Sequence, residues 1–291
     1  MTVIGAIFFS FSLEVIVKMV KLLVFDLDGT VVWEKDHKTI TDKTFEAIKY
    51  AADKGVIVMI ATGRMLSGIQ DFLVDNKNIK YLITTNGSKL IDLSTKEILF
   101  SNPLSYDKVK ELRDKAEELG LFYELYCDGQ SYAPRKNKEN ILKFNIHKEW
   151  FKMLNERPIA FENLEDLMLK GKKEVEKFNM LSIPYEMYNR VWEEFGKIKG
   201  INQVSSIKIN IEINNETTSK WSAIKVLTEK LGIKDSEIMT VGDSGNDYEM
   251  IKKAGIGVAM GNGFDEVKKV ANYITDFDYN DGFAKAVYKF I

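Results

Sequence analysis

Two short apolar runs with a helix between them constrain the fold of this chain more than any other feature. Residues 22–26 and 56–61 are short, mainly apolar runs that contain β-branched side chains, which is typical of strands buried on both faces of a sheet. The residues between them favour a helix, because Thr41 suits its N-cap and Gly55 stands where helices commonly end. A strand, a helix and a second strand in succession predict a parallel sheet.

The last third of the chain repeats this pattern. Ser219 suits the N-cap of a helix that ends at Gly232, and a strand over 237–241 follows. A second helix stops at Gly255 and leads into a strand over 256–259. We therefore expect the two ends of the chain to form halves of one doubly wound, Rossmann-like parallel sheet, which is an α/β fold.

The middle of the chain has a different character. The dipeptide Asp128-Gly129 joins two β-rich runs and is a strong signal for a hairpin. Residues 105–120 predict an amphipathic helix, residues 148–199 a charged, helix-rich stretch, and residues 205–213 a half-exposed antiparallel strand. This combination indicates an α+β insert rather than more of the parallel sheet.

The chain of 291 residues is long enough for two compact units. We expect a core of residues 19–86 and 216–291 and an inserted domain of residues 87–215. Residues 1–18 contain an apolar run that is too short to cross a bilayer, and we interpret them as an extension outside the fold. A signal or anchor, or an extra packed element, are the alternatives for this segment.

Charge and cysteine content narrow the partners and the location. The formal net charge is -2, with 41 basic and 43 acidic residues, and no long stretch carries one sign. This pattern argues against nucleic-acid binding, and no stable membrane association is expected. The single cysteine cannot form an intramolecular disulfide, which favours a cytoplasmic protein. The sequence does not predict an oligomeric state.

Three of the predicted strands end in polar side chains. Asp26 and Asp28 follow the first strand, Thr62 follows the second, and Asp243 follows the strand over 237–241. Because ligands bind at the carboxyl edge of open parallel sheets, we expect these residues to converge. Crowded carboxylates repel one another unless a cation is present, and Mg²⁺ with a phosphate group fits such a set of oxygen atoms.

A phosphate group also needs donors and a fixed cation around its oxygen atoms. Thr62, the backbone amides around Gly63 and Lys220 at the start of a helix supply these. The Asp26 carboxylate is placed to attack phosphorus. Asp28, two residues further on an extended chain, lies on the same side and can handle the proton of the leaving group.

Four motifs, in order, resemble those of the haloacid dehalogenase superfamily. They are Asp26-Leu-Asp-Gly-Thr30, Ala-Thr62-Gly-Arg64, Lys220 at a helix start, and Gly-Asp243-Ser-Gly-Asn246-Asp247. The segments Ile83-Thr-Thr-Asn86-Gly87 and Ala259-Met-Gly-Asn262 look like the Cof-type subgroup, whose members carry a large α/β cap of the C2B type. The resemblance covers residues 19–291, and within the insert it extends only to topology.

The resemblance implies a role for each matching residue. Asp26 would be the nucleophile that forms an aspartyl-phosphate, and Asp28 would be the general acid that later activates water. The groups implied around the phosphate are Thr62, Gly63, Lys220 and Asn246. The groups implied around Mg²⁺ are the Asp26 carboxylate, the backbone carbonyl of Asp28 and Asp243. Asp247 would orient Lys220 or the shell of the metal.

The sequence therefore predicts Mg²⁺-dependent hydrolysis of small phosphate monoesters, such as a sugar phosphate or a similar metabolite. A phosphomutase or phosphotransferase acting on sugar phosphates is one alternative, and a catalytically silent module that binds a phosphorylated ligand is another. Arg64 either neutralises the carboxylates or covers the surface. His37 and His147 are expected to be solvated. The substrate itself depends on cap residues whose positions the sequence does not reveal.

Overall fold

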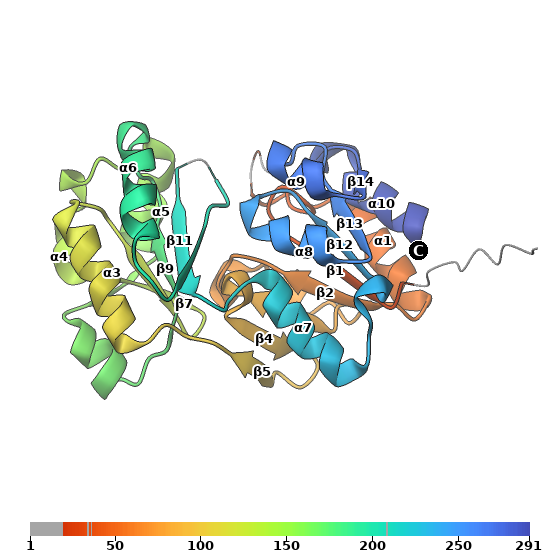
Figure 1. The fold of residues 1–291 in the computed structure, drawn as a ribbon, viewed down its shortest axis with the longest axis horizontal. Helices are drawn as coiled ribbons and strands as arrows, with labels where there is room; N and C mark the ends of the chain where they lie inside the picture. The colour runs from red at the N-terminus through yellow and green to blue at the C-terminus, as the bar shows by residue number, and fades with distance from the viewer. Residues whose placement is uncertain (1–19, 34, 36, 208) are drawn as a thin grey trace, which may run out of the picture.

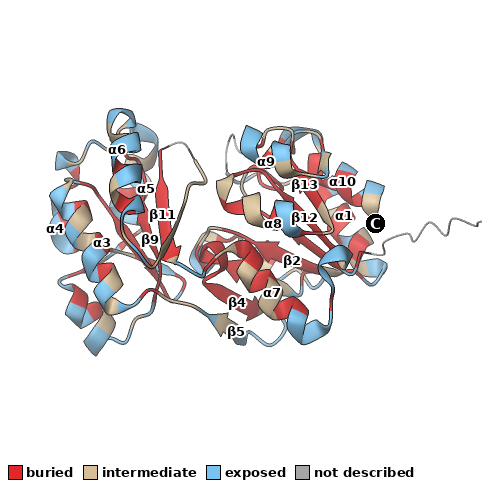
Figure 2. Cartoon of the chain, in the orientation of Figure 1, coloured by how far each residue is buried: buried red, intermediate tan, exposed pale blue. Residues whose placement is uncertain are grey.

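The computed structural model describes residues 20–291, except residues 34, 36 and 208. The extension predicted for residues 1–18 lies outside this range. The described chain forms two lobes, which we call the core and the cap, and it passes from the core to the cap and back again (Figure 1). In both lobes the strands are mostly buried, while the helices expose their outer faces (Figure 2).

The core is built on a sheet in the order β14-β13-β12-β1-β2-β3-β4-β5. Its first six strands in this order run parallel, and the last two, β4 and β5, are antiparallel additions at one edge. The strands are β1 (Leu22–Phe25), β2 (Ile57–Ala61), β3 (Tyr81–Thr84), β4 (Lys89–Asp92), β5 (Ile98–Ser101), β12 (Ile238–Gly242), β13 (Ile256–Ala259) and β14 (Tyr273–Ile274). The predicted doubly wound α/β fold is confirmed.

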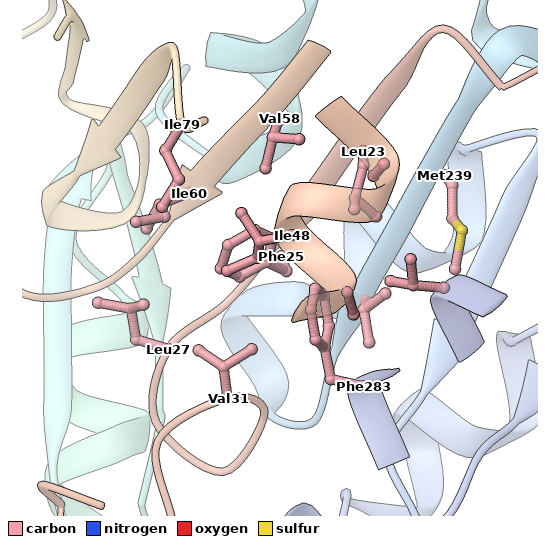
Figure 3. Packing of buried hydrophobic residues seen from close by; sticks show 14 of the residues in the cluster. Leu23, Phe25, Leu27, Val31, Ile48, Val58, Ile60, Ile79, Met239 and Phe283 are labelled. Atoms are coloured by element: carbon pink, nitrogen blue, oxygen red, sulfur yellow. The ribbon is translucent and has the colours of Figure 1, made fainter. Parts of the chain in front are cut away.

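Helices pack on both faces of this sheet because its strands are apolar on both sides. Leu23 and Phe25 of β1 join one buried cluster, part of which Figure 3 shows, whereas Leu22 and Val24 join the cluster on the opposite face. This follows from the alternation of side chains along a strand. The core helices are α1 (Asp42–Asp53), α2 (Asp71–Val74), α7 (Lys220–Leu231), α8 (Tyr248–Lys253), α9 (Asp265–Val270) and α10 (Gly282–Phe290).

The predicted helix ends agree with the structure. The side chain of Thr41 caps α1 by accepting a hydrogen bond from the backbone of Thr44. Ser219 caps α7 in the same way, and Gly232 ends that helix in the left-handed conformation with φ 67°. The N-cap at Ser219 fixes the residue at which α7 begins, and it therefore places Lys220 in the first turn of this helix.

The cap contains a six-stranded sheet in the order β10-β11-β9-β6-β7-β8. Its strands are β6 (Glu124–Cys127), β7 (Gln130–Pro134), β8 (Ile159–Phe161), β9 (Val175–Met180), β10 (Ile201–Val204) and β11 (Ile211–Asn215), and its helices are α3 (Tyr106–Glu118), α4 (Arg135–Glu139), α5 (Lys148–Glu156) and α6 (Tyr185–Gly196). The predicted hairpin is present, and Asp128 and Gly129 both have positive φ, as a tight hairpin turn requires.

Two predictions for the insert need correction. The range 87–215 predicted for the insert includes residues 89–101, but β4 and β5 extend the core sheet beside β3, so the cap sheet begins further along the chain. The strand predicted over 205–213 is also wrong in its bounds and exposure. The strand β11 starts at Ile211, and its first four residues are buried, because its polar side chains face the core rather than water.

Gly87 permits close packing between the segment that follows β3 and the start of α7. It has φ 113°, and a Cβ atom there would lie 2.1 Å from the carbonyl oxygen of Ser219. We expect Gly87→Ala to lower the free energy of unfolding by about 3 kcal/mol, through clash and backbone strain.

Gly232 at the other end of α7 provides the control for this substitution. Its φ is also positive, but a Cβ atom there meets nothing within 4 Å, so Gly232→Ala should cost about 1 kcal/mol. Denaturant unfolding of both variants measures the difference. Equal losses would contradict the importance of the close contact between Gly87 and Ser219.

Candidate active site

The predicted site residues lie at the carboxyl ends of neighbouring parallel strands. Asp26 follows β1, Thr62 follows β2, and Asp243 follows β12, and these strands are adjacent in the sheet. All three side chains are buried. Because a buried carboxylate is costly unless a cation or hydrogen bonds compensate it, this edge of the sheet is built for a charged ligand or a metal ion.

Lys220 supplies a buried positive charge to this edge. Its ammonium Nζ lies 2.9 Å from Asp26 Oδ1 and 2.6 Å from Asp247 Oδ1. Burial alone would lower the pKa of Lys220, but the charges of Asp247 and Asp26 outweigh it and hold the pKa above its usual value. Lys220 is therefore a permanent cation, and the N-cap residue Ser219 fixes its position at the start of α7.

Asp243 approaches the first motif closely. Its Oδ1 accepts a hydrogen bond of 3.1 Å from the hydroxyl of Thr30. Gly29 makes the approach possible, because its φ is 71° and a Cβ atom there would lie 2.6 Å from Asp243 Oδ2. The Gly-Thr pair after Asp28 therefore joins the loop after β1 to the loop after β12.

Asp26, Asp243 and Asp247 form a cluster in which one carboxylate oxygen of each lies within 4.8 Å of the others. Burial raises the pKa of Asp26 from 3.8 to about 7, and although Lys220 opposes this, the charges of Asp247 and Asp28 add to it. Burial and the charge of Asp247 also raise the pKa of Asp243 well above its usual value. The single positive charge of Lys220 does not balance the negative charges of these three carboxylates.

The cluster fits a hard divalent cation. Asp26 Oδ1 is buried and receives no hydrogen bond from the described residues, since its contact with Lys220 has the distance of an ion pair but not the alignment of a hydrogen bond. Asp247 Oδ2 accepts the backbone N–H groups of Asp243 and Ser244, at 2.9 and 3.1 Å. Both carboxylate oxygens of Asp247 thus already accept hydrogen bonds, from backbone N–H groups and from Lys220. Asp26 and Asp243 keep oxygen atoms available for a metal ion.

The Asp28 carboxylate is bound by residues outside this cluster. Arg64 donates to both of its oxygen atoms, at 2.7 and 2.5 Å, and His37 Nδ1 lies 3.2 Å from Asp28 Oδ1. Burial would raise the pKa of Asp28, but these contacts with His37 and Arg64 hold the pKa well below its usual range. His37 was expected to be solvated, and its side chain is 40% exposed, but the prediction missed its contact with Asp28. Of the two interpretations of Arg64, the structure favours the one in which it neutralises a carboxylate.

A network of polar side chains surrounds Thr62 and Gly63. The backbone N–H of Arg64 donates to the hydroxyl of Thr62 at 3.1 Å. The amide of Asn246 donates to Asn86 Oδ1 at 3.1 Å. The cap reaches the same place, because Lys177 Nζ donates to the carbonyl oxygen of Gly63 at 2.7 Å.

Sequence reasoning missed several residues of this network. Asn86 bonds Glu212 at 2.6 Å and Asn214 at 3.2 Å, both from β11. Asn86 lies in the motif Ile83-Thr-Thr-Asn86-Gly87, but these partners are more than 120 positions away in the sequence. Lys177 and Glu212 carried no sequence signal, apart from being charged residues in β-rich segments.

The comparisons with known proteins agree with this geometry. Residues 23–287 match the family model of haloacid dehalogenase-like hydrolases. The chain is 35% identical over 268 residues to the 5-amino-6-(5-phospho-D-ribitylamino)uracil phosphatase YcsE of Bacillus subtilis, covering 92% of this chain and 94% of that protein. It is also 28% identical over 282 residues to a second 5-amino-6-(5-phospho-D-ribitylamino)uracil phosphatase of Bacillus subtilis, YwtE. That match covers 91% of this chain and 96% of that protein.

A solved structure resembles the whole molecule as well. The sugar phosphatase BT4131, of haloacid dehalogenase subclass IIB, superposes with a TM-score of 0.76 at 26% identity, covering 93% of this chain and all of that one. Both lobes therefore have counterparts in a capped phosphatase. With its four motifs gathered at one sheet edge and a family model that spans nearly the whole described chain, this protein belongs to the haloacid dehalogenase-like hydrolases and is a phosphatase of that family.

Proposed function

We propose that this phosphatase hydrolyses small phosphate monoesters in a Mg²⁺-dependent reaction that passes through an aspartyl-phosphate on Asp26. The observation that carries the proposal is the buried Asp26 Oδ1, which lies 2.9 Å from Lys220 Nζ and receives no hydrogen bond from the described residues. A buried, ionisable oxygen atom beside a fixed cation is suited to attack an electrophile.

Each proposed step uses groups of this chain. Asp26 attacks phosphorus, the bond between phosphorus and the ester oxygen breaks, and Asp28 gives its proton to the departing oxygen. Water then attacks phosphorus, Asp28 takes its proton, and inorganic phosphate leaves Asp26 as a free carboxylate. The contacts of Asp28 with Arg64 and His37 favour its ionised form, which is the form that the second step needs. To donate a proton in the first step, Asp28 must be protonated, and its ion pair with Arg64 must break.

The surrounding groups would hold the phosphate and the metal ion. Thr62, the backbone of Gly63, Lys220 and Asn246 are the proposed phosphate ligands, and Asp247 keeps Lys220 in place. Asp26, Asp243 and the backbone carbonyl of Asp28 are the proposed ligands of Mg²⁺. When bound, the ion would offset the negative charge of the carboxylates and the phosphate.

The names of the relatives suggest the first substrates to test. The two relatives described above are named 5-amino-6-(5-phospho-D-ribitylamino)uracil phosphatases, and the structural neighbour described above is a sugar phosphatase. We propose a phosphorylated sugar or ribityl compound as the substrate class.

We also propose a cytoplasmic location, which the single cysteine supports. No helix in the described part of the chain is long and apolar enough to cross a membrane.

The test is release of inorganic phosphate from p-nitrophenyl phosphate and from the ribitylaminouracil phosphate. With Mg²⁺ we expect turnover of both, and with excess EDTA a loss of at least about a hundredfold, because the carboxylates lose their counter-charge. Addition of Mg²⁺ after EDTA should restore the rate. Full activity in EDTA would refute the metal dependence, and net isomerisation of a hexose phosphate without release of phosphate would favour a mutase.

A further inference from the structure

Three successive carbonyl groups in the loop after β2 accept hydrogen bonds from other parts of the chain. The two outer ones, of Thr62 and Arg64, accept from backbone N–H groups of the turn at residues 85–86, at 3.1 and 3.0 Å. That turn follows β3 and belongs to the core. The middle one, of Gly63, accepts from Lys177 Nζ of β9 at 2.7 Å. The cap therefore completes the support of a loop that lies in the core.

The bond from Lys177 acts on the Thr62 hydroxyl through one peptide group. The Gly63 carbonyl and the Arg64 N–H belong to the same peptide group, and this N–H donates to Thr62 Oγ1 at 3.1 Å. Because a peptide group is planar, fixing its carbonyl also fixes the direction of its N–H. Donation to the carbonyl polarises the group and strengthens the bond that the N–H makes. The hydroxyl oxygen is thereby held as an acceptor, which leaves its O–H to donate to a phosphate.

The surroundings of Lys177 suit a residue that holds a carbonyl group rather than a phosphate. Its side chain is 3% exposed, and its Nζ lies 3.1 Å from Glu212 Oε2 and 4.5 Å from the centre of the Tyr126 ring. An ammonium has three N–H groups, and the Gly63 carbonyl, the carboxylate and the ring are three acceptors for them. The pair of Lys177 and Glu212 also has no net charge, so its effect on the phosphate site is one of geometry.

We propose that Lys177 is a positioning residue for the phosphate site, which acts from the cap through the peptide group of Gly63 and Arg64 on the Thr62 hydroxyl. It touches neither the phosphate nor the leaving group. Its effect is therefore the same for every phosphate ligand, including inorganic phosphate. The inference rests on the proposed phosphatase reaction and adds one cap residue to the groups that prepare the site.

The experiment measures Ki for inorganic phosphate, the reaction product, against hydrolysis of p-nitrophenyl phosphate with Mg²⁺. Inorganic phosphate has no leaving group, so contacts between the cap and a leaving group do not enter the result. The variant Lys177→Met/Glu212→Gln removes both charges together, which leaves neither of them buried without its partner. We expect Ki to rise at least about tenfold, because the Thr62 hydroxyl is no longer held as a donor to phosphate.

A double-mutant cycle tests whether Lys177 acts through Thr62. Thr62→Ser keeps the hydroxyl and Thr62→Val removes it. The substitutions at Lys177 and Glu212 should raise Ki at least about tenfold with serine at position 62, but less than about threefold with valine. An equal rise with threonine, serine and valine would overturn the inference, because a direct contact with phosphate or a general role in holding the lobes together does not depend on this hydroxyl.

Lys177→Gln repeats the cycle with a smaller disturbance of the buried pair. Its amide can still donate to Glu212, but the side chain is one bond shorter than lysine and loses the bond to Gly63. The charge left on Glu212 repels phosphate equally whichever residue stands at position 62. The rise in Ki should again be at least about threefold larger with serine than with valine at that position, and equal rises would contradict the proposal.

The matched control is Lys136→Met/Glu117→Gln, the same two substitutions at an ion pair of 2.9 Å on the outside of the cap. It should change Ki less than about twofold in each Thr62 background. A tenfold rise in this control would show that any loss of a cap ion pair weakens phosphate binding, and the specific role of Lys177 would be refuted.

Failure of the proposed reaction gives a different result. In that case the wild-type protein would not hydrolyse p-nitrophenyl phosphate with Mg²⁺ present. Hydrolysis by wild type, with a Ki for inorganic phosphate that does not respond to the substitutions at Lys177, would refute the positioning role alone.

Discussion

Asp26→Asn is expected to reduce phosphate release at least about a thousandfold, because an amide cannot act as the nucleophile that the carboxylate provides. The substitution keeps the shape of the side chain, and the loss should therefore appear in kcat rather than in the fold. Phosphate release from p-nitrophenyl phosphate with saturating Mg²⁺ measures it. Activity within tenfold of wild type would mean that another group attacks phosphorus.

Stability measurements on the same variant provide an internal control. Asp26 ionises at about 7 in the folded chain, against a usual value of 3.8. Between these values the folded chain holds a proton that the unfolded chain has released, so without Mg²⁺ this group makes stability fall as pH rises from about 4 to 7. Asp26→Asn removes this contribution. Without metal, at pH above 7, we expect the variant to be at least as stable as wild type.

Lys220→Met should lower the free energy of unfolding by about 3–5 kcal/mol in the absence of metal. Removing one partner of a buried ion pair leaves the other uncompensated, and here both Asp26 and Asp247 lose their cation. Activity should fall as well, because the phosphate loses a proposed ligand. Denaturant unfolding at neutral pH, with and without Mg²⁺, measures the stability change.

Lys225→Met on the same helix is the matched control. Lys225 is partly exposed and pairs with Asp235 at 2.7 Å, so its loss should cost less than about 1 kcal/mol. If both lysine variants lost the same amount of stability, the buried ion pairs of Lys220 would not be what supports this edge of the sheet.

The sequence was most informative where local chemistry dictates structure. The apolar runs of β1 and β2, the cap at Ser219 and the turn at Asp128-Gly129 each follow from backbone and burial rules that act over a few residues. The convergence of the strand-end aspartates could also be expected, because parallel strands share one carboxyl edge.

The features that were missed depend on contacts between distant parts of the chain. The hairpin of β4 and β5 contains polar residues and looks like the start of an insert, yet pairing with β3 places it in the core sheet. Arg64 meets Asp28 only because the loops after β1 and β2 fold together, whereas His37 reaches Asp28 from within the same loop after β1. Glu212 lies in a strand that seemed half exposed, but its carboxylate is buried against Asn86.

The pairing of β1 with β12 has a consequence for biosynthesis. The strands of the cap sheet all lie between β1 and β12 in the sequence, so the ribosome completes every one of them before β12 emerges. Until then β1, which lies in the middle of the finished sheet, has an unpaired edge rich in apolar side chains. Such edges promote aggregation, and we expect nascent chains truncated before residue 238 to depend on chaperones more than the finished protein does.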